Sequence, residues 1–178
     1  MKLVAKIELL LIALWLGAAC FFSFGVAPAA FAVLPSAEMA GNVVNRTLLI
    51  VNVSGLIVAV LTLATSFLPQ TYPGLAWAWA RRIFLLLMAA GCAVGQFVIG
   101  FWIAILRAQT GKPVDQLAND DPIKLQFDML HQASVWTLII AMAAALIVFF
   151  LMTKKNADVA KDKPLIDPAF DFSKEMKI

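Results

Sequence analysis

Apolar residues fill four long runs of the chain, and short polar segments separate the runs. The runs cover residues 7–34, 43–68, 77–106 and 127–152. About 20 consecutive, mostly apolar residues let an α-helix cross the hydrocarbon core of a bilayer, so each run is long enough. The pattern predicts an all-α protein: a four-helix transmembrane bundle in residues 1–153, followed by a polar tail in residues 154–178.

The composition agrees with a membrane protein. Of the 178 residues, 62% are hydrophobic and 14% are charged, whereas soluble domains have about 45–50% apolar and about 25% charged residues. Most charges lie outside the four runs, which leaves no separate soluble domain. The net charge of +3 is explained by basic residues that flank helices at a membrane surface. We therefore expect the lipid bilayer as a partner and no binding to nucleic acid.

Basic residues near the membrane ends predict the orientation. Four crossings place both termini on one side, and that side collects eight basic residues: Lys2, Lys6, Arg81, Arg82, Lys154, Lys155, Lys161 and Lys163. The opposite side collects four: Arg46, Arg107, Lys112 and Lys124. Because basic residues concentrate on the cytoplasmic side, we expect a multi-pass protein of a bacterial inner membrane with both termini and the polar tail in the cytoplasm.

Proline and capping residues predict where helices bend and begin. Pro28 lies inside the first run and should kink it, because proline lacks an N–H and clashes with the preceding turn. Ser36 is a candidate N-cap for a short helical or turn segment at 37–41, before a second helix that begins near residue 43. Asp121 followed by Pro122 is typical of an N-cap and a first helical residue, so the last helix should begin outside the membrane.

Small residues at helical spacing predict where helices approach closely. Gly17 and Gly25 are about two turns apart in the first run, and Gly91 and Gly95 form a Gly-x-x-x-Gly motif in the third. Such spacing places small side chains on one face, where another helix can come close. We expect these glycines to pack against other membrane helices, from this chain, from another copy or from a larger complex.

One group of ionisable residues is a candidate binding site. Asp128 and His131 are three residues apart and therefore share a helix face. Such a pair can bind a metal or pass a proton; it can also simply anchor the helix at the interface. Arg46 and Arg107 lie on the same side of the membrane, so we expect one polar cluster, which is either an ion-paired lock or a vestibule for a ligand. His131 is the only histidine, and we expect function to depend on it more than on any other ionisable residue.

A resident metal or cofactor is not expected. A zinc site usually needs three or four ligands, and a haem held by two histidines would need a second chain. The sulfur-containing residues in the runs could suggest copper, but they form no spaced motif and suit core packing: Cys20, Met88, Cys92, Met129 and Met142. The identity of any metal stays unknown at this stage.

Two stretches of sequence carry a family resemblance. The first stretch consists of Trp15-Leu-Gly17, Val26-Ala-Pro28-Ala-Ala-Phe31 and Ala40-Gly41. The second consists of Gly111-Lys-Pro113 through Asp120-Asp-Pro122, then Phe127 and Leu130-His131-Gln-Ala-Ser134. These resemble the integral membrane family called domain of unknown function 4149. The resemblance implies a four-helix membrane protein and no assigned activity. The family is in turn distantly similar to four-helix copper-resistance and haem-pathway membrane proteins.

Three functions are compatible with these observations. The first is a non-enzymatic packing or accessory subunit of a membrane complex, which we favour because the chain has no catalytic motif. The second is a carrier or sensor for a small molecule or metal that uses the polar cluster around His131. The third is a haem-linked membrane protein with His131 as an axial ligand. We expect the protein not to be an enzyme.

The predicted orientation can be tested by cysteine labelling in intact cells. A cysteine placed at Lys112 should react with a membrane-impermeant reagent added from outside, because the loop that contains it faces away from the cytoplasm. A cysteine placed at Lys161 should react only after the cells are opened. The reverse pattern would show that the termini face outward.

Overall fold

Four long helices form the protein. The computed structural model describes residues 2–67, 75–110 and 113–161. Within these residues, four helical stretches are long and apolar enough to cross a membrane: Leu3–Val33, Ala37–Thr65, Leu75–Gln109 and Pro122–Thr153. The predicted all-α, four-helix transmembrane architecture is confirmed. Residues 162–178, most of the predicted tail, lie outside the described part of the chain.

The first and third spans each consist of two α-helices joined by a π-helical turn. In the first span, α1 (Lys2–Phe21), η1 (Phe22–Val26) and α2 (Ala27–Val33) follow one another without a break. In the third, α4 (Leu75–Ala93), η2 (Val94–Ile99) and α5 (Gly100–Gln109) do the same. The second span is α3 (Ala37–Thr65), and the fourth lies within α6 (Pro122–Lys161). A short 3₁₀ turn, η3 (Val114–Gln116), lies in the link between α5 and α6.

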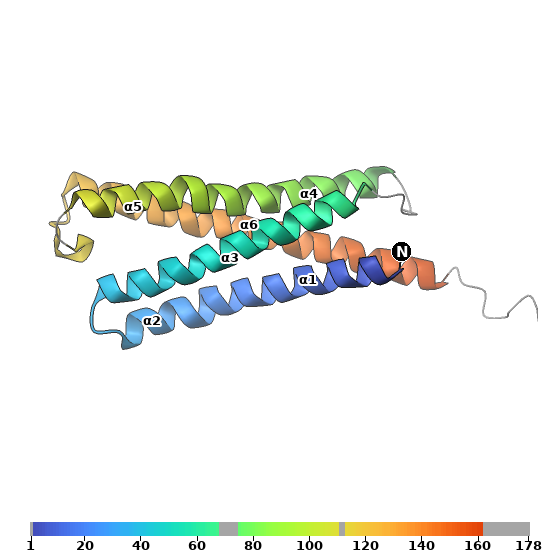
Figure 1. Ribbon diagram of the computed structural model, residues 1–178, viewed down its shortest axis with the longest axis horizontal. Coiled ribbons are helices and arrows are strands. Elements are labelled where there is room, and N and C mark those ends of the chain that lie inside the picture. Colours follow the sequence, from blue (N-terminus) through green and yellow to red (C-terminus); the bar gives the residue numbers. More distant parts are fainter. Residues whose placement is uncertain (1, 68–74, 111–112, 162–178) are drawn as a thin grey trace, which may run out of the picture.

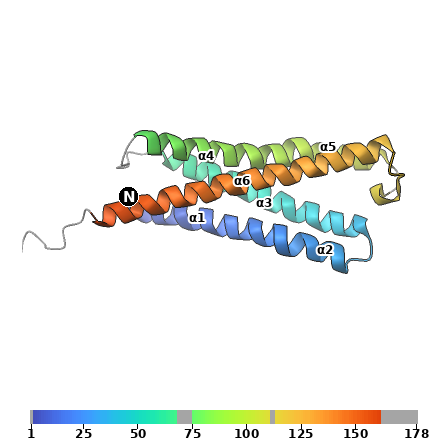
Figure 2. The same cartoon turned by 180° about the vertical axis from the view of Figure 1, so that it is seen from behind.

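The four spans are close together near the termini and spread apart at the other end. α1 packs on α3 and α6, and α4 packs on the same two helices, so α1 and α4 lie across the bundle from each other. At the end where α2 joins α3, the α2–α3 pair diverges from the α5–α6 pair (Figures 1 and 2). The bundle therefore has a closely packed end, near the N-terminus. Its open end is where α2 is linked to α3 and α5 is linked to α6.

Side-chain caps fix the beginnings of the two helices that line the open end. The Ser36 hydroxyl accepts a hydrogen bond from the Met39 N–H at 3.2 Å, so α3 begins at Ala37, and the expected short segment is the first turn of the long helix. The Asp121 carboxylate accepts from the Ile123 N–H at 2.8 Å, and α6 begins at Pro122 as predicted. Each cap satisfies a backbone donor that the first helical turn leaves without a partner.

The π-helical turn in the first span lies directly before Pro28. The Ala27 N–H donates to the Phe22 carbonyl, five residues back. A regular α-helix would bring the proline ring against the carbonyl of Phe24, four residues back, and a wider turn relieves this clash. The expected disturbance at Pro28 thus takes the form of a π-helical turn, which begins at the depth where the bundle opens.

In the core of the bundle, Trp15 packs among many small residues. The Trp15 indole N–H donates to the Val51 carbonyl of α3 at 2.8 Å. Gly55 makes room for this ring, since a Cβ there would lie 2.5 Å from the indole nitrogen. Buried alanines continue the contact between α1, α3 and α6: Ala19, Ala59, Ala141, Ala144 and Ala145. Close helix contacts of this kind stabilise a bundle in lipid, where no hydrophobic effect drives helices together.

The four glycines predicted to mediate packing divide into two pairs. A Cβ on Gly91 would lie 3.0 Å from the Thr137 carbonyl oxygen and 3.1 Å from the Ala141 Cβ, and one on Gly95 would lie 3.3 Å from side-chain atoms of α3 and α6. In the first span, a Cβ on Gly17 would meet nothing within 4 Å, and one on Gly25 would meet only Phe21 of the preceding turn. Gly91 and Gly95 therefore pack within this chain, whereas Gly17 and Gly25 do not.

This division predicts the effect of enlarging a glycine. Gly91→Leu should destabilise the protein by about 1–3 kcal/mol, because the new side chain must push α6 away from α4. Gly17→Leu, the matched control in an exposed position, should change stability by less than about 0.5 kcal/mol. Thermal unfolding in mild detergent measures both. Equal stability of the two variants would show that α4 and α6 are not packed as described.

Candidate functional site

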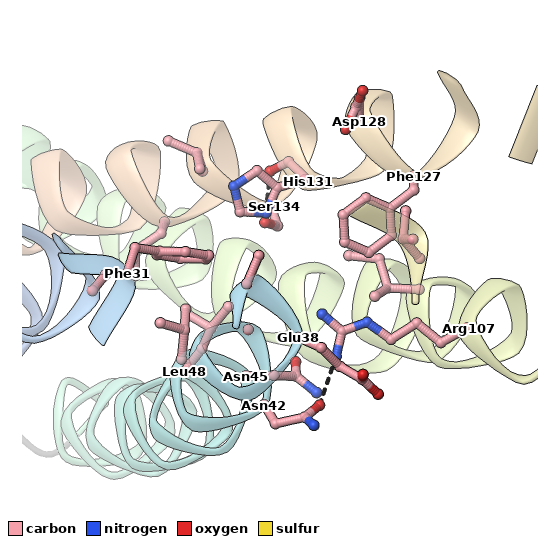
Figure 3. Close-up of a pocket in the computed structure, with 18 of the residues that line it drawn as sticks. Phe31, Glu38, Asn42, Asn45, Leu48, Arg107, Phe127, Asp128, His131 and Ser134 are labelled. Atoms are coloured by element: carbon pink, nitrogen blue, oxygen red, sulfur yellow. Dashed lines mark hydrogen bonds between the residues drawn. The ribbon is translucent and has the colours of Figure 1, made fainter. Parts of the chain in front are cut away.

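A pocket of about 710 Å³ lies at the open end of the bundle, between the diverging helix pairs. Side chains of η1, α2 and α3 form one wall, and side chains of α5, the following link and α6 form the other. In the close-up, Phe31, Asn42 and Leu48 face Arg107 and His131 across this space (Figure 3). The pocket exists because the Pro28 region and the two links leave these helices too far apart for side chains to fill the gap.

The outer end of the pocket is polar, and Arg107 lies at its centre. The guanidinium donates from Nη1 to the Asn42 Oδ1 at 3.0 Å, which connects α5 to α3 across the pocket. Its carbon lies 5.4 Å from the centroid of the Phe127 ring, and that ring stacks on His131 with centroids 6.3 Å apart and planes within 4° of parallel. A cation above an aromatic face is attracted by the ring's quadrupole, so Phe127 helps to fix the guanidinium.

The predicted polar cluster forms only in part. Arg107, Asp128 and His131 all line the pocket, whereas Arg46 is exposed and does not. Asp128 lies on the opposite side of Phe127 from Arg107 (Figure 3), and no Arg107–Asp128 ion pair occurs among the described residues. Of the two alternatives for this cluster, the geometry resembles a vestibule more than an ion-paired lock.

The inner end of the pocket is apolar and opens sideways. Aromatic and aliphatic side chains line it: Phe22, Phe24, Phe31, Leu48, Val135, Leu138, Ile139 and Met142. Several of these are also strongly exposed, with Phe24 at 81% and Phe31 at 51%. In a membrane-spanning segment, exposed apolar side chains face lipid. The pocket therefore communicates with the bilayer as well as with the polar end of the bundle.

A second polar site, which the sequence analysis did not identify, lies at the closely packed end. Arg81 of α4 donates from Nη2 to the Glu8 Oε2 of α1 at 3.0 Å, and both side chains are about 95% buried. The same nitrogen donates to the Thr62 carbonyl of α3 at 3.4 Å. The sequence carries one signal for this pair, because Glu8 and Arg81 each lie inside an apolar run, where a charged side chain needs a partner.

No metal centre is recognisable in the described part of the chain. No group of three or more His, Cys, Asp or Glu side chains there could hold a metal ion. Cys20 is half-buried, Cys92 is buried, and both are free thiols. His131 has an aromatic ring and a pocket beside it, but no carboxylate partner among the described residues.

The comparison with known families identifies the group to which this architecture belongs. Residues 10–112 match the family described as a domain of unknown function, DUF4149, and they make up more than half of the chain. The chain belongs to the DUF4149 family. This match confirms the resemblance inferred from the sequence, and the four membrane-spanning helices agree with it.

The family match covers one wall of the pocket and part of the other. Within the DUF4149 region lie most of the first span and all of the second and third, with Arg107 and Asn42. The last helix, which contributes Phe127 and His131, lies beyond the matched region, so the resemblance quoted for that helix stays a prediction. Neither the curated proteins nor the solved structures contained a match to this DUF4149 protein.

The buried ion pair yields a stability prediction. Glu8→Leu leaves Arg81 buried without its carboxylate and should cost about 3–5 kcal/mol, whereas the double variant Glu8→Leu/Arg81→Leu should recover much of this loss, because no charge stays buried. Glu38→Leu, at an exposed glutamate, is the control and should be close to neutral. Unfolding midpoints in mild detergent measure the stability of the three variants. If Glu8→Leu were as stable as wild type, the ion pair could not be buried as described.

Proposed function

We propose that this DUF4149 protein is a membrane-embedded binding protein that holds a small amphipathic molecule in the pocket at its open end. The observation that supports this most directly is the change in lining along the pocket. Arg107, Asn42 and His131 lie at the outer, polar end, and Phe22 and Met142 lie at the inner, apolar end. An amphipathic molecule has the same division between a polar group and an apolar chain.

The size and direction of the pocket support the same proposal. Along α6 its lining runs from Lys124 to Met142, which at 1.5 Å per residue is about 27 Å of helix. The pocket thus follows the membrane normal from the interface towards the middle of the bilayer. An apolar chain is shielded from water equally well in the pocket and in the lipid, so its retention depends on packing in the pocket and on the polar end.

This proposal corresponds to the carrier or sensor among the functions considered from the sequence. The molecule would enter from the bilayer between α6 and the exposed aromatic side chains of Phe24 in η1 and Phe31 in α2. If both termini are cytoplasmic, as we propose from the basic residues, the polar end of the pocket lies at the outer surface of the membrane. His131 then lies next to the polar group of the bound molecule, where its ring nitrogens can hydrogen-bond to that group.

The role of an accessory subunit is a separate proposal. The exposed surface around Gly17, where a Cβ would meet nothing within 4 Å, allows close approach of a further helix. Gly91 and Gly95 no longer support this role, because they contact helices of the same chain. Co-purification in mild detergent distinguishes the two proposals, since an accessory subunit brings a constant set of proteins and a binding protein brings a small molecule.

Filling the pocket should remove the bound molecule. Leu48→Trp/Ile139→Trp places two large side chains in the pocket lining, whereas Leu49→Trp/Ile140→Trp places the same side chains one residue along each helix, at exposed positions outside it. Native mass spectrometry of the purified proteins should show a retained amphipathic molecule with wild type and with the second variant, and not with the first.

Two outcomes would count against a binding pocket. If the first variant retains the same molecule, that molecule is surface lipid and the proposal is wrong. If wild type retains nothing and takes up no added amphipathic molecule, the proposal is also wrong. Equal unfolding midpoints of the two variants would show that any difference in binding comes from the pocket and not from stability.

A further inference from the structure

The two cations in the pocket lining are held by neutral amides and not by carboxylates. Arg107 donates to the Asn42 side chain at 3.0 Å, and Lys124 donates from Nζ to the Asn119 side chain at 2.6 Å. Among the described residues, the one carboxylate–cation contact within 4.0 Å is Glu8–Arg81 at the far end of the bundle. An amide oxygen orients a cation without neutralising it, so the pocket retains two positive charges at its polar end.

The Arg107 guanidinium is held in a defined position. Phe127 covers it from α6 at 5.4 Å, Asn42 holds it from α3, and Gly41 leaves space for it, since a Cβ there would lie 2.9 Å from Nη2. A planar guanidinium that is already oriented loses little further entropy when it binds a ligand. Arg107 is also only partly exposed, so water screens its charge less than at an open surface.

The nearby carboxylates form no ion pair with Arg107 among the described residues. Glu38 and Asp128 line the pocket but are exposed. Asp128 is separated from Arg107 by the Phe127 ring (Figure 3). Exposed carboxylates in contact with water interact weakly with charges beyond the first contact distance. The site nearest the oriented guanidinium therefore favours an anion.

We propose that the pocket selects an anionic amphiphile, whose phosphate or carboxylate headgroup binds Arg107, with Lys124 on the same wall. This inference rests on the proposed function and names its ligand class. Arginine pairs with both headgroups through two parallel N–H···O bonds. The apolar chain of the amphiphile lies along Leu48, Ile139 and Met142, towards the middle of the membrane.

Matched pairs of ligands test the headgroup. The purified full-length protein in a neutral detergent is titrated with phosphatidic acid and with diacylglycerol, which differ only in the phosphate, and with oleate and oleyl alcohol, which differ in the carboxylate. Displacement of a fluorescent fatty acid reports binding. Wild type should prefer the anionic member of each pair by about tenfold or more, as expected for one charge-assisted hydrogen-bonded contact.

Variants then separate recognition by Arg107 from its structural contact with α3. Arg107→Gln should lose the preference for the anionic member while still binding the neutral one. Asn42→Ala breaks the same connection between α5 and α3 but keeps the cation, so it should weaken the preference much less than Arg107→Gln does. Arg107→Lys keeps the charge without the two-pronged geometry and should show a smaller preference; this variant decides the question if Arg107→Gln does not fold.

Each result either supports or overturns the inference. If wild type binds both members of each pair equally, the anionic headgroup is wrong. If Arg107→Gln keeps the full preference, Arg107 is not the group that binds the headgroup. The amphipathic pocket stands in both cases. If inorganic phosphate alone displaces the probe as well as phosphatidic acid does, the ligand is a free anion and not an amphiphile. If no pair member binds, or if Leu48→Trp/Ile139→Trp binds as wild type does, the proposed function itself fails.

Discussion

The Glu8–Arg81 ion pair is the interaction on which the arrangement of this bundle depends. It connects α1 and α4, the two helices that lie across the bundle from each other. Arg81 also donates to the Thr62 carbonyl, which connects the pair to α3. In the low dielectric of a membrane, a buried charge without its partner is very costly. The pair therefore holds three helices in one register near the termini, and the contacts of α6 with α1 and α4 complete the packed end.

The packed end makes the open end possible. Because small residues and the Trp15–Val51 hydrogen bond hold the helices together up to the middle of the membrane, the remaining halves of the helices can diverge without loss of the fold. The π-helical turns η1 and η2 lie in the second halves of the first and third spans. The pocket is thus a consequence of helix geometry and not of a missing side chain, and a ligand can enter or leave it without unfolding the core.

The proposed ligand class follows from the division of the bundle into a packed end and an open end. One end of the pocket lies among the links and contains oriented cations, and the other lies beside exposed aromatic and aliphatic side chains at membrane depth. A molecule that already lies in the bilayer, with its polar group at the surface, would enter without turning over.

The sequence by itself determined the number and the class of the helices, their caps at Ser36 and Asp121 and the position of the disturbance at Pro28, because these depend on local apolar length and on backbone hydrogen bonding. It also indicated His131, Asp128 and Arg107 as polar residues at one end of the bundle. It could not show that Arg81 pairs with Glu8, 73 residues away, that Arg107 contacts Asn42 and Phe127, or that Arg46 lies outside the pocket. Those facts depend on the rotation of each helix about its axis and on which helices are neighbours. Hydrophobicity along a chain does not encode these, since in a membrane the outer face of a helix is as apolar as its core face.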